Sequence, residues 1–164
     1  MKTIPQYLSY EELEKLIRSL PTPMIKEAVT IMYVYALRIN ELCSLDRSNV
    51  DLSKDVIRIE GKGGYIRELP IKEYTREILI NAMRRPGHLF NLSVRSLRNY
   101  IYLAASRSKI GHVHPHMIRH SRATHLMNEG TELQDIKAWL RHANIASTLI
   151  YTHVALERLR ATIS

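Results

Sequence analysis

Hydrophobic residues recur at helical spacing near the start of the chain. Ser9 and Glu12 form a capping box, and the apolar positions that follow share one helix face: Leu13, Leu16, Ile17 and Leu20. Pro21 ends this helix because proline lacks the backbone N–H that a helix interior requires. Residues 28–37 are almost entirely apolar and predict a buried helix that runs into Arg38.

The middle of the chain changes to alternating periodicity. Residues 56–60 and 65–69 alternate apolar and polar side chains and flank the turn Gly61-Lys62-Gly63-Gly64. Two such runs around a glycine-rich turn predict an antiparallel β-hairpin.

Helical periodicity then returns. We expect helices over about residues 73–84, from the N-cap Ser93 to Gly111, from Pro115 to Gly130, and in the segment after it. The predicted fold is mainly α with a small antiparallel β-sheet (α+β), and residues 1–164 form a single domain.

Charge narrows the class of partner. The chain has 24 lysine and arginine residues against 16 aspartate and glutamate residues, a formal net charge of +8. Such an excess favours a surface that binds phosphates, although an ordinary basic protein has the same composition. The single cysteine, Cys43, excludes an internal disulfide, and no apolar run is long enough to span a membrane. We therefore expect a cytoplasmic protein that has no membrane partner.

Basic side chains are concentrated in residues 114–120. On a helix that begins at Pro115, His116 and Arg119 stand three positions apart on one face. Both are costly to bury, and the guanidinium pushes the imidazole toward its neutral form. A phosphate between them would resolve the conflict, because arginine binds two oxygens at once and neutral histidine exchanges a proton.

Arg38 raises a similar question at the end of its apolar helix. Its guanidinium requires either an anion or an acidic neighbour such as Glu41. Downstream, His142 precedes Tyr151 in the last part of the chain. Tyr151 is one of nine tyrosines, and a tyrosine taken alone is more often a packing residue.

Taken together, these segments resemble the catalytic domain of the tyrosine recombinases, also called the phage integrase family, in its Xer-like branch. The resemblance runs essentially end to end. Its most specific parts are Leu37-Arg38-Ile39-Asn40-Glu41-Leu42, the HxxR pattern from His116 to Arg119, and the spacing from His142 to Tyr151. The turn that contains Lys62 resembles the lysine hairpin of that family.

The resemblance implies a tyrosine recombinase catalytic-domain fold, of the DNA breaking-rejoining type, and a metal-free chemistry. Tyr151 would attack the phosphorus of duplex DNA and form a 3′-phosphotyrosine, which stores the bond energy for rejoining without ATP. Arg38 and Arg119 would neutralise the phosphate oxygens. His116 would act as the general base and acid, and Lys62 would donate a proton to the leaving 5′-oxygen. His142 would hydrogen-bond the phosphate. A glycine-flanked lysine is also common in a solvated turn.

The sequence departs from the family pattern at two places. The family usually has Thr-Gly where this chain has Tyr35-Ala36, and a glycine where it has Arg141. Neither change touches a residue with an implied catalytic role. Both therefore put the catalytic efficiency in question but leave the class of enzyme unchanged. Arg141 either strains its turn or adds a phosphate contact.

Two other functions remain open. One is a non-catalytic DNA-binding module on the same scaffold, and the other is a type IB-like topoisomerase. Four arginines are candidate contacts to the DNA backbone: Arg95, Arg98, Arg107 and Arg141. The first three, with Lys109, could also form only a solvated helix face. Histidines 114, 116, 120 and 125 suggest zinc, but no HExxH pattern and no second cysteine completes a ligand set, so we expect no metal and no cofactor.

The ends of the chain give two further expectations. Members of the family usually carry an N-terminal core-binding domain, and we expect it to be absent here. The C-terminal tail would allow self-assembly on DNA, with Leu156, Leu159 and Ile163 as anchors, or would pack back on its own domain.

Overall fold

The computed structural model describes residues 6–140 and 160. Its helices are α1 (Tyr10–Arg18), α2 (Pro23–Val34), α3 (Ile39–Ser44), α4 (Glu73–Met83), α5 (Val94–Ser108), α6 (Pro115–Asn128) and α7 (Leu133–Leu140), with a 3₁₀ turn at Arg47–Asn49. Its strands are β1 (Val50–Asp51), β2 (Val56–Glu60) and β3 (Ile66–Pro70). The predicted α+β class is confirmed.

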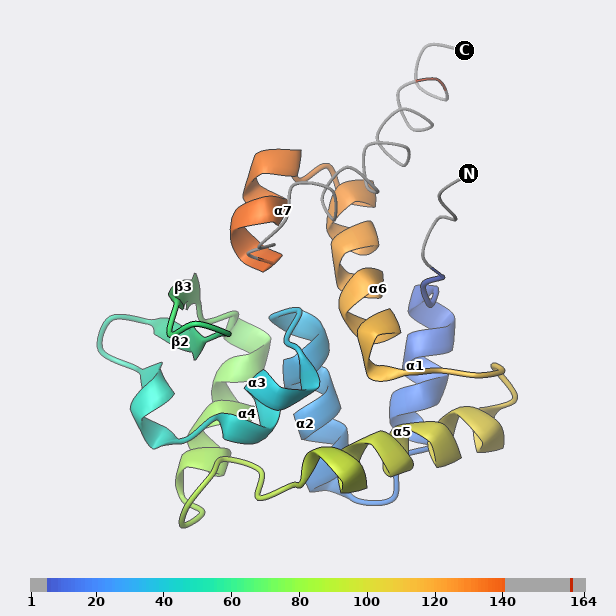
Figure 1. Cartoon of the computed structure of the whole chain (residues 1–164), viewed down its shortest axis with the longest axis horizontal. Coiled ribbons are helices and arrows are strands. Elements are labelled where there is room, and N and C mark those ends of the chain that lie inside the picture. Colours follow the sequence, from blue (N-terminus) through green and yellow to red (C-terminus); the bar gives the residue numbers. More distant parts are fainter. Residues whose placement is uncertain (1–5, 141–159, 161–164) are drawn as a thin grey trace.

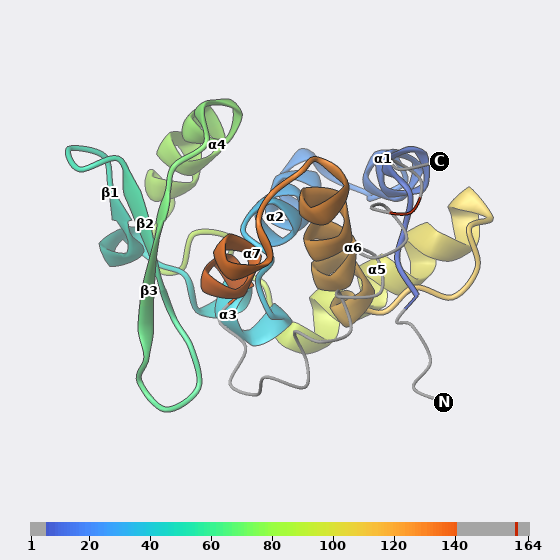
Figure 2. The same cartoon turned by 90° about the horizontal axis from the view of Figure 1, so that it is seen from above.

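The elements divide into two regions that meet at α3 and α7. The sheet and α4 lie together on one side of the molecule, while α1, α2, α5 and α6 form the helical side (Figures 1 and 2). In this helical part α2 packs against α1, α3 and α6, α5 packs against α1 and α3, and α6 packs against α7. The junction between the regions is where the candidate site lies.

The predicted hairpin is confirmed. Strands β2 and β3 pair antiparallel, with Ile57 opposite Leu69 and Ile59 opposite Arg67. The turn closes through a hydrogen bond from the Gly61 N–H to the Tyr65 carbonyl at 2.8 Å, and both Gly63 and Gly64 have positive φ. The short strand β1, which periodicity did not predict, adds a third strand on the free side of β2.

The capping box of α1 is also confirmed. The Ser9 N–H donates to Glu12 Oε2 at 2.8 Å, and the Glu12 N–H donates to Ser9 Oγ at 3.1 Å. Leu13 and Leu16 are buried on the inner face of this helix.

The prediction that one helix continues to residue 37 is wrong. Helix α2 ends at Val34, and Ala36 has a φ of +51°, in the left-handed region. The Ala36 N–H donates to the Tyr33 carbonyl at 3.0 Å and the Leu37 N–H to the Met32 carbonyl at 2.8 Å. This pair of bonds is a Schellman motif, which terminates a helix by satisfying its last carbonyls. Apolar composition hid the break, because the loop residues are as buried as the helix itself.

The predicted end of α5 also needs correction. The helix stops at Ser108, before the predicted end at Gly111, and its C-cap residue is Lys109, which has a φ of +58°. At the end of α6 the expectation holds, since Gly130 has a φ of +96° and follows the cap residue Glu129.

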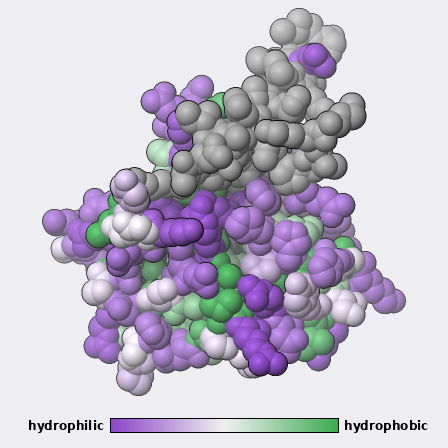
Figure 3. All heavy atoms as spheres, in the orientation of Figure 1, coloured by the Kyte–Doolittle hydropathy of each residue, from purple (hydrophilic) through white to green (hydrophobic). Residues whose placement is uncertain are grey.

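Burial is organised in two apolar clusters. The larger one joins α1 to α5 with the sheet, and a smaller one joins the loop before α3 to α6 and α7 through Ala36, Ala123, Leu126, Met127, Ile136 and Leu140. Hydrophilic residues dominate the face seen in Figure 3, with small hydrophobic patches between them. None of the helices in the described part of the chain is both long and apolar enough to cross a membrane.

Candidate active site

The break between α2 and α3 positions Arg38. This residue is the N-cap of α3, and its N–H donates to Glu41 Oε1 at 2.8 Å. Its guanidinium lies 3.9 Å from Glu41 Oε2, with 38% of the side chain exposed. The acidic neighbour that the sequence suggested is therefore present, and the partly exposed guanidinium can still reach an anion from solvent.

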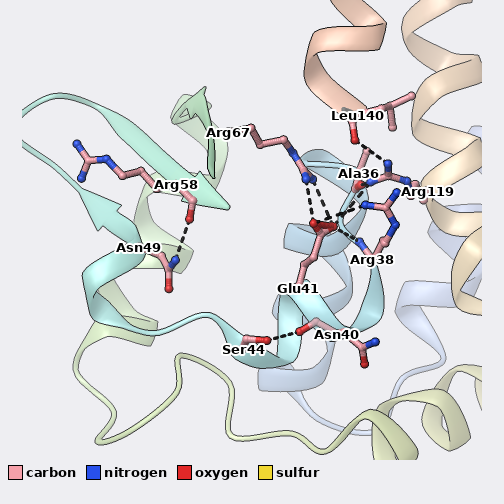
Figure 4. Close-up of polar contacts among 10 residues, drawn as sticks. All are labelled: Ala36, Arg38, Asn40, Glu41, Ser44, Asn49, Arg58, Arg67, Arg119 and Leu140. Carbon is pink, nitrogen blue, oxygen red and sulfur yellow. Dashed lines mark hydrogen bonds and ion pairs between the residues drawn. The ribbon is translucent and has the colours of Figure 1, made fainter. Parts of the chain in front are cut away.

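Glu41 is the centre of the polar cluster at this junction. Its carboxylate is almost fully buried and faces three guanidiniums, those of Arg38, Arg67 and Arg119 (Figure 4). Arg67 Nη1 lies 2.9 Å from Glu41 Oε2, and Arg119 Nη1 lies 3.8 Å from Glu41 Oε1. One negative charge among three positive ones leaves this cluster with net positive charge.

Arg119 is held deep in the site by backbone carbonyls. It is only 2% exposed, and its guanidinium donates to the Ala36 carbonyl and, at 2.6 Å, to the Leu140 carbonyl. These bonds connect α6 to the loop before α3 and to the end of α7. The HxxR helix thus brings Arg119 to the same carboxylate as Arg38, which lies far away in the sequence.

His116 lies one helical turn before Arg119, on the exposed side of α6. Desolvation, with the positive charges of Arg119 and Arg38, lowers the pKa of the His116 imidazole. Its ring meets that of His120 edge-on at 5.3 Å between centroids. Burial, with the charge of His116 next in importance, lowers the pKa of His120 to about 4. Both imidazoles are therefore mainly neutral at pH 7, the form that accepts a proton.

The turn that carries Lys62 begins beside Glu41. A Cβ added to Gly61 would lie 3.5 Å from Glu41 Oε2, so the backbone immediately before Lys62 lies against the carboxylate. Lys62 itself is exposed.

Arg67 is a member of the cluster that the sequence reasoning missed. It sits opposite Ile59 on the buried face of the hairpin, where only 7% of the residue is exposed. A signal was available in the strand register. The core face of β2 carries Ile57 and Ile59, so the residue paired with Ile59 had to point inward although it is charged.

Tyr35, one of the two departures from the family pattern, connects three elements. Its hydroxyl accepts from the Lys72 N–H at 3.0 Å and lies 2.6 Å from Thr75 Oγ1 at the start of α4. Its ring stacks on that of Trp139 in α7, with 6.2 Å between centroids. Trp139 also donates to the Val34 carbonyl at 3.2 Å, so the aromatic pair fixes α7 against the end of α2.

The candidate DNA-contacting arginines of α5 are exposed. Arg95 and Arg98 line one open hollow together with Tyr102, and Arg107 lies further along the helix. Four other predicted features lie outside the described residues: Arg141, His142, Tyr151 and the C-terminal tail.

The histidines that suggested zinc have other surroundings. In residues 6–140 and 160, no three His, Cys, Asp or Glu side chains come together as a possible metal site. His125 is buried, with Nδ1 2.7 Å from the Tyr33 hydroxyl and Nε2 2.8 Å from the Leu8 carbonyl. That histidine connects α6 to the segment just before α1.

Comparison with known proteins places this arrangement in a family. The model of the phage integrase family matches residues 6–158. The tyrosine recombinase XerC of Bacillus subtilis (strain 168) is 36% identical over 185 residues, a match that covers 98% of this chain and 61% of that protein. The chain thus spans about three fifths of the length of this relative.

Solved structures agree with the sequence comparison. The XerA recombinase has a TM-score of 0.80 and 26% identity, over 99% of this chain and 66% of that one. The XerH site-specific recombinase bound to difH substrate, in a pre-cleavage complex, has a TM-score of 0.79 and 25% identity, over 99% and 55%. Because the family model matches most of this chain and the fold is shared, this chain belongs to the phage integrase family.

Proposed function

We propose that this chain is the catalytic domain of a site-specific recombinase or integrase that cuts and rejoins duplex DNA. Tyr151 attacks the scissile phosphorus, the bond to the 5′-oxygen breaks, and the DNA is held as a 3′-phosphotyrosine. Rejoining reverses these steps, so neither a metal ion nor ATP is required.

The observation that carries the proposal is the convergence of Arg38 and Arg119 on one carboxylate. The two residues come from different helices, yet both guanidiniums lie within 4 Å of Glu41. A buried carboxylate that balances only part of this charge leaves an attractive site for a phosphodiester. Fixed guanidiniums stabilise the charge that develops on the phosphate oxygens in the transition state.

The remaining roles follow from the chemistry of each side chain. His116, neutral near pH 7, accepts the phenolic proton of Tyr151 and returns it on rejoining. Lys62 protonates the departing 5′-oxygen, and His142 donates a hydrogen bond to the phosphate. Arg95, Arg98, Arg107 and Arg141 contact the DNA backbone, and the C-terminal tail supports assembly on DNA.

A nicked suicide substrate tests this function directly. Cleavage near the nick releases a short fragment, so rejoining fails and the protein stays attached to the DNA. We expect a covalent adduct with the unaltered chain and none with Tyr151→Phe. Tyr74→Phe is the matched control, because Tyr74 is 61% exposed on α4 and has no role in the proposed chemistry, and it should form the adduct normally.

The alternatives give different results in the same experiment. DNA binding without an adduct under any condition would contradict catalysis and indicate a non-catalytic binding module. An adduct together with relaxation of supercoiled plasmids that share no common site would indicate a topoisomerase.

A further inference from the structure

Arg67 joins the hairpin that carries Lys62 to the polar cluster around Glu41. From the start of β3 its guanidinium reaches α3 and contacts Glu41 with two nitrogens, Nη1 at 2.9 Å and Nη2 at 3.5 Å (Figure 4). The backbone at Gly61, between β2 and Lys62, runs close to the same carboxylate, since a Cβ added there would lie 3.5 Å from Glu41 Oε2. Arg67 therefore ties β3 to Glu41, close to where the backbone enters the turn that carries Lys62.

Stability alone is a poor explanation for this arginine. A buried ion pair often contributes less than apolar side chains of similar volume, because both charges lose their hydration. Within the described residues, Arg67 Nε is also buried without a hydrogen-bond partner. A leucine or methionine opposite Ile59 would avoid both costs, so the charged residue indicates a requirement beyond packing.

Of the three guanidiniums in the cluster, that of Arg67 lies nearest to the Glu41 carboxylate. Arg67 Nη1 lies 2.9 Å from Glu41 Oε2, whereas the guanidiniums of Arg38 and Arg119 lie 3.9 and 3.8 Å from the same carboxylate. Without Arg67 the hairpin would lose this side-chain link to α3.

We propose that Arg67 is a positioning residue that, through Glu41, holds the hairpin so that Lys62 reaches the leaving 5′-oxygen. The inference rests on the proposed function, and it assigns to Arg67 an effect on proton donation, not on the attack by Tyr151. Misplacement of a reacting group by about 1 Å can slow a reaction by about 100-fold.

A change of leaving group isolates proton donation. In the ordinary substrate the tyrosine oxygen bonds to phosphorus, the bond to the 5′-oxygen breaks, and Lys62 supplies the proton. In a substrate with sulfur at the 5′-bridging position the leaving group departs as a thiolate, which is far less basic than an alkoxide and needs no proton. Single-turnover adduct formation is measured on both substrates with the 164-residue chain.

The variants are Arg67→Met, Arg67→Lys, Lys62→Ala and Arg58→Met. Arg58 is the matched control, because it lies on β2 of the same sheet and pairs with Glu68 at 2.7 Å and Asp51 at 3.5 Å, outside the cluster. We expect Arg67→Met and Lys62→Ala to slow cleavage of the oxygen substrate by about 100-fold and of the sulfur substrate by less than about 5-fold. Arg67→Lys should fall between them and the unaltered chain, and Arg58→Met should cleave both substrates normally.

Circular dichroism and thermal unfolding show whether each variant folds. If Arg67→Met does not fold, Arg67→Lys decides, since it keeps one positive charge beside Glu41. Equal slowing on both substrates by a folded Arg67 variant, while Lys62→Ala is rescued by sulfur, would overturn this inference and leave the proposed function intact. Absence of any Tyr151-dependent adduct from the unaltered chain would overturn the proposed function, and the inference with it.

Discussion

Ala36 joins local backbone geometry to the candidate site. It occupies the left-handed position of the Schellman motif after α2, and its carbonyl accepts a hydrogen bond from Arg119. A left-handed conformation costs a residue with a Cβ about 1–2 kcal/mol, whereas glycine adopts it freely. This geometry explains why a glycine is usual here in the family; in this chain Ala36 adopts the same left-handed conformation.

Ala36→Gly tests the strain at this position. We expect the free energy of unfolding to stay the same or to rise by up to about 1 kcal/mol, because relief of strain offsets the lost methyl contact. Ala28→Gly is the control, since Ala28 is fully buried inside α2 and should lose about 1 kcal/mol or more. Urea denaturation measures both, and equal destabilisation of the two variants would contradict the strain at Ala36.

The lowered pKa of His120 predicts how the free energy of unfolding depends on pH. Its pKa of about 4 in the folded chain lies below the ordinary value of 6.5, so the unfolded chain binds more protons between these values. The contribution of His120 is fully present above pH 6.5 and is lost as the pH falls toward 4. His120→Asn should therefore show a shallower loss of stability over that range in urea titrations. An unchanged slope in this variant would contradict the burial of a neutral imidazole.

At the scale of elements, the ends of helices and one aromatic pair determine how the two regions meet. Tyr35 lies in the loop between α2 and α3, yet its hydroxyl bonds to Lys72 and Thr75 at the start of α4 and its ring packs on α7. Lys72, just before α4, lies over the Trp139 ring at 5.2 Å. These contacts hold α7 in place, and α7 leads into the segment that carries His142 and Tyr151.

Tyr35→Phe measures the polar part of this junction. Loss of the two hydroxyl contacts should lower the free energy of unfolding by about 1–2 kcal/mol, because the Lys72 N–H loses its partner in a part-buried place. Tyr102→Phe, at an exposed position on α5, should change it by less than about 0.5 kcal/mol. Chemical denaturation of both variants checks this, and a neutral Tyr35→Phe would refute the role of the hydroxyl.

Local patterns predicted the elements well and their tertiary partners poorly. The Ser9 capping box, the hairpin with its glycine-rich turn and the Pro115 helix start are encoded by neighbouring residues, and the structure agrees with them. The break at Ala36 was missed because hydropathy does not report backbone φ. The Glu41–Arg67 pair was missed because it joins α3 to β3, and only the paired strand shows that Arg67 faces inward.

At the scale of the whole molecule, the net charge indicates which kind of partner the surface attracts. The net charge of +8 and the exposed arginines of α5 favour binding to a phosphate backbone. Such contacts position a duplex without specifying its sequence, so they favour DNA in general over any one site.

Salt dependence tests this surface. Binding of the chain to duplex DNA should weaken steeply with added salt, since each phosphate contact releases counterions. The double variant Arg95→Gln with Arg98→Gln should reduce the slope of log affinity against log salt by about 2. Arg76→Gln is the control, because Arg76 is already paired with Asp55, and it should leave the slope nearly unchanged. Binding that does not respond to salt would contradict a phosphate-contacting surface.

The central claim is that a phosphate held by Arg38 and Arg119 is attacked by Tyr151, and mass spectrometry of the trapped adduct tests it most directly. Digestion with trypsin and nuclease should leave a nucleotide on the peptide of residues 142–158, in which Tyr151 is the single tyrosine. Fragmentation should assign the added mass to the Tyr151 side chain. A nucleotide on another tyrosine or on a serine would contradict the account, and so would a chain that binds the substrate and never acquires this mass.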